Sequence, residues 1–247
     1  ETILKKKSGW FALSLFLKWA TKSMEVVYED NHLIVVNKAA GEIVQGDKTG
    51  DKPLSEMVKD YLREKYNKPG NVFCGVIHRL DRPVSGLVVF AKTSKALARM
   101  NEIFQNRKVK KTYWAISRNL PPRAEGMLVD YLTPRERNNK TYVSRTPVDG
   151  AQKAVLDYKL LAKTDYYCLL EVNLHTGRKH QIRAQLSAMG CPIRGDLKYG
   201  DRRSNPDGGI SLQSHRIVFE HPVSKKIIDL VAPIPDDNLW RALAANL

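Results

Sequence analysis

Cysteine is scarce in this chain of 247 residues, and the three that occur, Cys74, Cys168 and Cys191, form no C-x-x-C pair. An odd number of widely spaced cysteines indicates neither a disulfide framework nor a zinc site, and it favours a reducing cytoplasm. Metal-ligand spacing is also lacking among the six histidines: His175 and His180 have no nearby cysteine or acidic partner in a zinc motif. We therefore expect no metal ion.

Long apolar runs are absent as well. Lys18 interrupts the longest one, residues 10–17, so no stretch of the sequence is long enough to span a bilayer. The lysines at 5–7 resemble the start of a secretory signal, but no small-x-small cleavage pattern follows them. The chain does not begin with Met, and Met24 opens directly onto strand-like sequence. We expect residues 1–23 to be a basic and apolar extension, poorly ordered or not native, and residues 24–247 to form one domain.

Acidic residues are few relative to basic ones. The chain has 26 Asp and Glu against 41 Lys and Arg, a formal net charge of +15 and a pI near 9.7. Such an excess favours a polyanionic partner, either nucleic acid or an anionic membrane surface, although a merely soluble basic surface has the same composition. The 43% of hydrophobic residues are enough for a sizeable core.

The pattern of apolar residues predicts an α+β protein. A buried strand at 32–36 is followed by a helix that Pro53 opens and Pro69-Gly70 ends, and a second buried strand at 87–90 is followed by a helix that Ser94 caps and that runs to about Arg107. One further helix is expected at about 179–188, ended by Gly190. Strands in succession with few helices indicate a mixed, largely antiparallel central sheet with flanking helices. The remaining strands are expected at 112–116, 127–132, 141–145, 154–161, 167–174, 210–219 and 226–231.

The segment HRLDRPVSG, residues 78–86, places one acidic residue between two arginines just before a buried strand. Nearby positive charges favour the ionised carboxylate, so we expect a lowered pKa for Asp81, which suits a nucleophile or a base better than an acid. A structural ion pair at a turn accounts for the same residues equally well.

A second segment, LHTGRKHQIR at 174–183, has a glycine turn that leads into a helix start carrying several basic side chains. Free backbone N–H groups and cations at a helix N-terminus bind phosphate. The alternative is a solvated basic first turn, which is disfavoured because helix starts prefer acidic residues. Ile182, Leu186 and Met189 define a buried stripe, and Arg183 beside Ile182 is predicted to point inward, toward a carboxylate.

A third segment, KKTYWAI at 110–116, puts Tyr113 and Ala115 on one face of a strand and Trp114 on the other. A tyrosine next to lysines is suited to stacking on an unpaired base. Strand aromatics are also common in hydrophobic cores, so this feature alone decides nothing.

Together these segments resemble the RluA-type pseudouridine synthases. The resemblance rests on H-R-L-D-R-x-x-S-G-L-x-x-F-A-K-T around Asp81, L-x-T-G-R-x-H-Q-I-R around Arg183, K-x-Y around Tyr113, and the opening segment YEDNHLIVVNK. It extends from about Met24 to the C-terminus. Val84 stands where the family commonly has Thr and Ala39 where it commonly has Pro, and no S4-type RNA-binding module is expected before Met24.

The resemblance implies a pseudouridine-synthase-like fold with an active-site cleft across the sheet, and isomerisation of uridines in ribosomal or transfer RNA without a cofactor. It implies that Asp81 attacks the nucleotide or abstracts a ribose proton, that Arg183 pairs with Asp81, and that Tyr113 lies against the uracil. Phosphate or other RNA contacts are expected from Arg79, Arg82, Arg178, Lys179 and His78, the last of which is equally suited to a structural hydrogen bond.

Two other functions are compatible with these residues. A basic RNA-binding protein without turnover would bind RNA in a salt-sensitive way and form no product. A glycosidase-like hydrolase would need a second carboxylate as its acid partner, and none is evident beside Asp81. The expected partner is structured RNA and not a membrane, and the expected state is a monomer.

Overall fold

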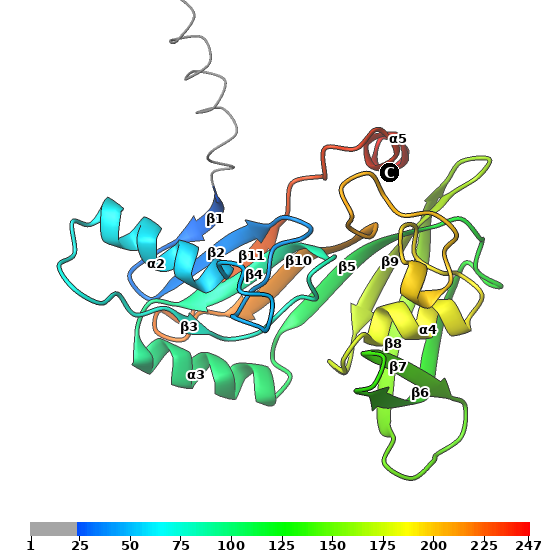
Figure 1. The fold of residues 1–247 in the computed structure, drawn as a ribbon, viewed down its shortest axis with the longest axis horizontal. Coiled ribbons are helices and arrows are strands. Elements are labelled where there is room, and N and C mark those ends of the chain that lie inside the picture. The colour runs from blue at the N-terminus through cyan, green and yellow to red at the C-terminus, as the bar shows by residue number, and fades with distance from the viewer. Residues whose placement is uncertain (1–23) are drawn as a thin grey trace, which may run out of the picture.

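The computed structural model describes residues 24–247, so the expected extension at 1–23 lies outside the described residues. Its centre is a mixed sheet in the order β1-β2-β4-β10-β5-β9-β8-β6-β7, with β11 beside β10 and β3 beside β4 (Figure 1). The strands are β1 Glu25–Glu29, β2 Leu33–Lys38, β3 Gly75–Val76, β4 Ser85–Ala91, β5 Lys110–Ser117, β6 Glu125–Arg135, β7 Lys140–Ser144, β8 Gln152–Lys163, β9 Cys168–Leu174, β10 Leu212–Glu220 and β11 Ile227–Val231.

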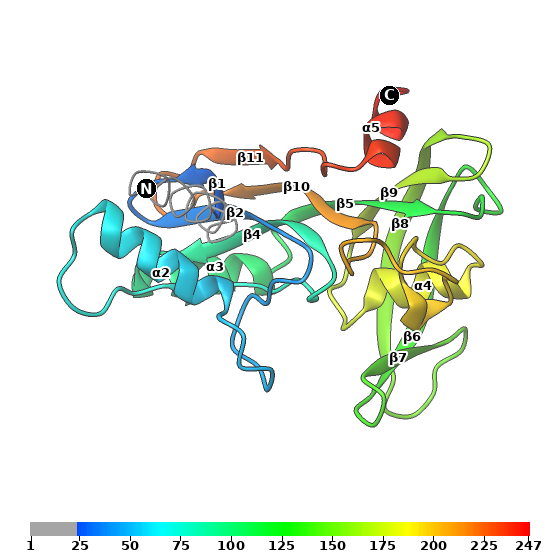
Figure 2. The same ribbon diagram turned by 45° about the horizontal axis from the view of Figure 1, so that its top comes forward.

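The pairing within this sheet confirms the predicted α+β class. Within residues 24–247, β4 and β10 form the one parallel pair, and the other pairs are antiparallel. Both views place α2 and α3 beside the half of the sheet formed by β1 to β4, and α4 beside β6 to β8 (Figure 2). The helices are α2 Leu54–Lys65, α3 Ser94–Gln105, α4 Gln181–Ala188 and α5 Asn238–Ala244, with a short 3-10 helix at Leu197–Tyr199.

Alternation along β2 and β4 divides the core beneath α2 from the core beneath α3. Val36 and Val88 pack in the cluster that contains α2, whereas Val35 and Val89 pack in the cluster that contains α3. Both strands are therefore covered on two faces, which explains why they read as continuous apolar runs in the sequence.

Helix starts followed the sequence prediction with one correction. Pro53 precedes α2 as predicted, but the residue that caps α3 is Thr93 and not Ser94, because the Thr93 side chain accepts a hydrogen bond from the Ala96 N–H at 3.1 Å. Thr93 has the extended backbone typical of an N-cap, so Ser94 is the first helical residue.

Gly86 permits the close approach of β4 to β10. Its φ is +110°, and a Cβ added there would lie 2.4 Å from the carbonyl oxygen of Ser214, its partner in the parallel pair. A side chain at position 86 would collide with the backbone of Ser214. It would also require residue 86 to keep a positive φ, which L residues rarely adopt.

Gly86→Ala is expected to lower the free energy of unfolding by about 3 kcal/mol or more, because steric overlap adds to backbone strain. Urea denaturation measures the change. Gly150→Ala is the matched control, since Gly150 also has a positive φ but has nothing within 4 Å of its added Cβ; it is expected to lose only about 1–2 kcal/mol. Equal losses in the two variants would show that contact with β10 is unimportant.

A buried histidine makes stability depend on pH. His215 is 9% exposed and stacks on Trp114 with 3.6 Å between ring centroids. Burial, with a smaller effect of the Arg216 charge, lowers the pKa of His215 to about 4. The folded chain therefore keeps this ring neutral where the unfolded chain takes up a proton, so stability falls as pH decreases through about 6.5 and levels off below the folded pKa.

His215→Gln removes this titration. The stability difference between the unaltered chain and the variant is expected to narrow by about 2 kcal/mol between pH 7 and pH 5. Urea denaturation at both pH values gives the free energy of unfolding of each protein. Subtracting the two values removes the contribution of the titrating groups that both proteins share. A constant difference would mean that the folded protein binds a proton at His215 as readily as the unfolded chain.

Candidate active site

Asp81 lies in the loop between β3 and β4, and buried Lys38 holds that loop in place. The Val84 N–H donates to the Asp81 carbonyl at 3.0 Å, which closes the turn. The Lys38 Nζ donates to the carbonyl oxygens of Arg82 at 3.0 Å and Val84 at 2.6 Å. Burial lowers the pKa of Lys38 to about 8 against the opposing charges of Glu42 and Asp81. Sequence reasoning did not single out Lys38, because the two loop carbonyls that it binds lie 44 and 46 residues away.

Arg183 joins Asp81 to a second carboxylate. Its Nη1 donates to Asp81 Oδ2 at 3.0 Å, while Nε and Nη2 donate to the two oxygens of Asp196 at 2.7 and 3.0 Å. The predicted inward direction of Arg183 is confirmed, since the residue is 5% exposed. Burial alone would lower the pKa of Arg183, but the hydrogen bonds and charges of Asp196 and Asp81 hold it above its ordinary value. The guanidinium is thus a fixed positive group beneath a partly exposed carboxylate.

His180 also faces Asp81. Its Nε2 lies 3.6 Å from Asp81 Oδ2 and its Nδ1 lies 2.8 Å from the Tyr199 hydroxyl, which accepts a hydrogen bond from the Thr141 N–H at 2.7 Å. The Tyr199 O–H is therefore left to donate to Nδ1, so we assign the ring proton to Nε2, facing Asp81. Burial lowers the pKa of His180 to about 4 despite the Asp81 charge. A neutral N–H donor and a cation thus lie on the same side of Asp81.

Residue pairing across four neighbouring strands places Tyr113 beside the Asp81 loop. Lys38 pairs with Gly86, Gly86 with Ser214, and Ser214 with Tyr113 across β2, β4, β10 and β5. Tyr113 is 7% exposed, and burial, with a smaller effect of the Asp81 charge, raises its pKa to about 12. The register therefore brings Tyr113 to the same part of the sheet as the Asp81 loop.

The four arginine and lysine side chains predicted to contact RNA differ in their exposure and in the hydrogen bonds that they already make. Arg79 and Lys179 are exposed. The Arg82 Nε donates to the Gly41 carbonyl at 3.0 Å and its Nη2 pairs with Asp51. The Arg178 Nε donates to the Lys153 carbonyl at 3.2 Å. Contacts of these four side chains with RNA stay a prediction.

His78 contacts β4 and α3. Its Nε2 accepts a hydrogen bond from the Val89 N–H at 3.1 Å, and its ring stacks on Phe104 of α3 at 5.1 Å. Burial lowers the pKa of His78 to about 3. This geometry is that of the structural hydrogen-bonding role, and an RNA contact by His78 stays untested.

Asp196, Tyr199 and His180 are site residues that sequence reasoning did not select. Nothing in the sequence around Asp196 indicates that its carboxylate meets Arg183, 13 residues earlier. In the part of the chain that the structure describes, no group of three His, Cys, Asp or Glu residues is arranged to hold a metal ion. No helix within 24–247 has the length and apolar character needed to cross a membrane.

Comparison with known proteins gives one consistent result. The family model described as RNA pseudouridylate synthase matches residues 32–188. The chain is 34% identical to a tRNA pseudouridine synthase C of Vibrio parahaemolyticus over 91% of this chain and 95% of that protein. It is 31% identical to a ribosomal large subunit pseudouridine synthase D of Vibrio cholerae over 92% of this chain and 73% of that protein. The solved human RNA pseudouridylate synthase domain containing 4 has the same fold, with a TM-score of 0.73 at 24% identity over 94% of this chain and 95% of that one.

Proposed function

The chain belongs to the RNA pseudouridylate synthase family and is an isomerase, and we propose that it converts selected uridines of ribosomal or transfer RNA to pseudouridine with Asp81 as the catalytic carboxylate. The observation that carries this proposal is the contact at 3.0 Å between Asp81, whose side chain is 31% exposed, and the buried guanidinium of Arg183. Residues 24–247 are proposed to form the catalytic unit.

The reaction fixes what the site must supply. The N1–C1′ bond of the uridine breaks, the uracil turns, a C5–C1′ bond forms, and the C5 proton is lost while N1 gains one. The product is an isomer, so neither a redox partner nor an added group is needed. Asp81 is proposed either to attack the nucleotide or to take a ribose proton, and both routes require a carboxylate oxygen that faces the sugar.

Asp81 is suited to that task because its two oxygens differ. Among the described residues, the hydrogen bond from Arg183 and the approach of His180 both involve Oδ2. Oδ1 is thereby left for the substrate. We propose that Arg183 and the neutral Nε2–H of His180 orient the carboxylate, so that little reorganisation is needed when the nucleotide binds.

Tyr113 is proposed to lie against the uracil during its turn. Its raised pKa, about 12, keeps the phenol protonated near neutral pH. The hydroxyl can therefore donate a hydrogen bond while the ring supplies a flat apolar surface.

RNA binding is proposed to rest on the positive charge of the whole chain. The target uridine must leave its stack, which costs a few kcal/mol in a paired site and less in a loop. A net charge of +15 provides sequence-independent attraction that offsets this cost. Arg79, Arg82, Arg178 and Lys179 are proposed as phosphate contacts in this binding.

The geometry around Arg183 disfavours a hydrolase. Asp196 is a second carboxylate near Asp81, but it is 1% exposed and both of its oxygens accept hydrogen bonds from Arg183. It is therefore not placed to protonate a leaving group, which a glycosidase-like mechanism requires.

The test is nucleoside analysis of transcribed transfer RNA and ribosomal RNA fragments after incubation with the purified chain of 247 residues. We expect pseudouridine to appear at discrete positions, located by carbodiimide labelling and primer extension, without release of free uracil. Free uracil would identify a hydrolase. Salt-sensitive RNA binding without product would identify a binding protein, and either result would contradict the proposal.

A further inference from the structure

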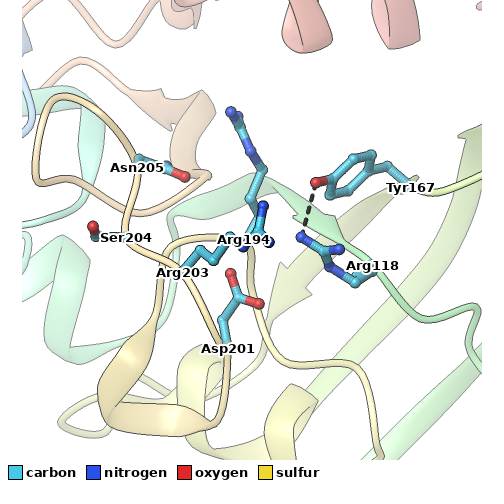
Figure 3. Close-up of a pocket in the computed structure, with 7 residues that line it drawn as sticks. All are labelled: Arg118, Tyr167, Arg194, Asp201, Arg203, Ser204 and Asn205. Carbon is cyan, nitrogen blue, oxygen red and sulfur yellow. Dashed lines mark hydrogen bonds between the residues drawn. The ribbon is translucent and has the colours of Figure 1, made fainter.

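A pocket of about 140 Å³ separate from the Asp81 contacts is lined by three arginines, Arg118, Arg194 and Arg203, together with Tyr167 and Asp201. Figure 3 shows Arg118 and Tyr167 on one side of this pocket and the loop that carries Asp201 and Arg203 on the other. We refer to it as the three-arginine pocket. Three arginines and one lining carboxylate around so small a volume favour an anionic ligand.

The backbone on one side of the three-arginine pocket is fixed by the sheet. Ser117, at the end of β5, forms an isolated bridge with Ile193, so the residues that follow each of them, Arg118 and Arg194, leave neighbouring points of the backbone. The Arg194 N–H donates to the Ile116 carbonyl at 2.8 Å, which holds this arrangement.

Tyr167 orders the two guanidinium groups beside it. The Arg118 Nη2 donates to the Tyr167 hydroxyl at 3.0 Å, and its guanidinium carbon lies 5.2 Å from the ring centroid. The Arg194 guanidinium carbon lies 6.0 Å from the same centroid. Cation–π contacts of this kind preorganise cations without neutralising their charge.

The carboxylates nearby do not neutralise the pocket. Asp237 pairs with Arg194 at 3.1 Å. The oxygens of Asp201 accept hydrogen bonds from backbone N–H groups, those of Gly195 at 2.6 Å and Arg202 at 2.8 Å. Among residues 24–247, Arg118 and Arg203 have no ion-pair partner. Because Asp201 supplies only one further negative charge, the pocket keeps an excess of positive charge.

We propose that the three-arginine pocket binds a backbone phosphate of the substrate RNA, at a nucleotide other than the uridine that is isomerised. This inference rests on the proposed function, because it takes RNA to be the substrate. Guanidinium groups match phosphate through paired, charge-assisted hydrogen bonds, and phosphate contacts set the position and orientation of a nucleic acid on a protein.

The pocket is joined to the catalytic ion pairs by one short segment. Arg194 lines the pocket and Asp196, two residues later, holds Arg183, so their Cα atoms are no more than about 7 Å apart. The Asp201 N–H also donates to the Asp196 carbonyl at 3.0 Å. A phosphate in the pocket would therefore hold the RNA at a fixed distance from Asp81.

Filter binding of labelled bulk transfer RNA tests this proposal, with every variant made in the Asp81→Asn chain. The pocket variant is Arg118→Gln with Arg203→Gln. The control, Arg107→Gln with Lys108→Gln, removes the same charge from exposed residues after the end of α3. The pocket variant is expected to bind about tenfold more weakly at 0.1 M salt, as loss of one charge-assisted contact implies, and the control to change little.

The salt dependence and a competitor give two further results. The slope of log affinity against log salt concentration is expected to fall by about 0.7–0.9 in the pocket variant, the value for one lost phosphate contact. Equal losses in pocket variant and control would overturn the proposal, as would an unchanged affinity. Binding of inorganic phosphate to the unaltered pocket but not to the pocket variant, with no change in RNA affinity when phosphate is added, would identify a free-phosphate site instead. Because binding and not turnover is measured, an error in the Asp81 assignment would leave this result unaffected.

Discussion

A chain carrying Asp81→Asn is expected to form pseudouridine at least about 10³-fold more slowly than the unaltered chain, because an amide can neither attack the nucleotide nor take a proton. The fold should persist, since Arg183 retains both of its hydrogen bonds to Asp196. RNA affinity should be equal or slightly higher, because the change removes a negative charge near bound phosphates. Single-turnover product formation and filter binding with one RNA measure the two effects.

Asp165→Asn is the matched control for this substitution. Asp165 is exposed in the turn between β8 and β9, so the same chemical change there removes the same charge outside the site. The control is expected to retain turnover close to that of the unaltered chain. Substantial product formation by Asp81→Asn would remove Asp81 from the chemistry, whatever its contacts.

Arg183→Met is expected to cost both stability and turnover. It leaves the carboxylate of Asp196, 1% exposed, buried without its ion-pair partner, and breaking a buried pair in this way costs about 3–5 kcal/mol. It also removes the group that orients Asp81. Arg183→Lys is expected to rescue little, because an ammonium group cannot reproduce three directed bonds to two carboxylates. Urea denaturation and single-turnover assays measure these losses.

A double variant separates the two roles of Arg183. Adding Asp196→Leu to Arg183→Met removes the unpaired buried charge, so most of the lost stability is expected to return. Turnover is expected to stay low, because Asp81 still lacks its guanidinium partner. If turnover returned together with stability, Arg183 would serve the fold alone. Arg145→Met provides a control for general destabilisation, since it removes an ion pair to buried Asp130 that does not include Asp81 or Arg183.

Local patterns in the sequence correctly predicted the features that depend on residues close together in the chain, such as the face of a helix or strand on which a side chain lies. The stripe of Ile182 and Leu186 correctly directed Arg183 into the protein, because side chains three or four residues apart share a helix face. Alternation along β5 likewise placed Tyr113 and Trp114 on opposite faces, and they pack in different clusters. The family itself followed from the same motifs, and the family model and relatives confirm it.

Features that depend on distant residues or on very short segments were not predicted. β3 has two residues, too few for a clear periodic signal, and α5 was also missed. Some contacts join segments that only the folded protein brings together. Examples are the hydrogen bonds of Lys38 and the bidentate ion pair between Arg183 and Asp196. Thr93 and Ser94 are both good N-caps, and the backbone at Thr93 decides between them.

Mapping pseudouridine in total RNA tests the central role of Asp81 most directly. RNA from cells with the intact gene is compared with RNA from cells in which the gene carries Asp81→Asn, by carbodiimide labelling and primer extension, with expression of both proteins verified. The account predicts that one or more pseudouridines disappear in the Asp81→Asn cells and return when the intact gene is restored. Sites that are retained in the Asp81→Asn cells but lost when this gene is deleted would contradict the account. It would also be contradicted if the map stayed unchanged after deletion of this gene together with every related synthase gene in those cells.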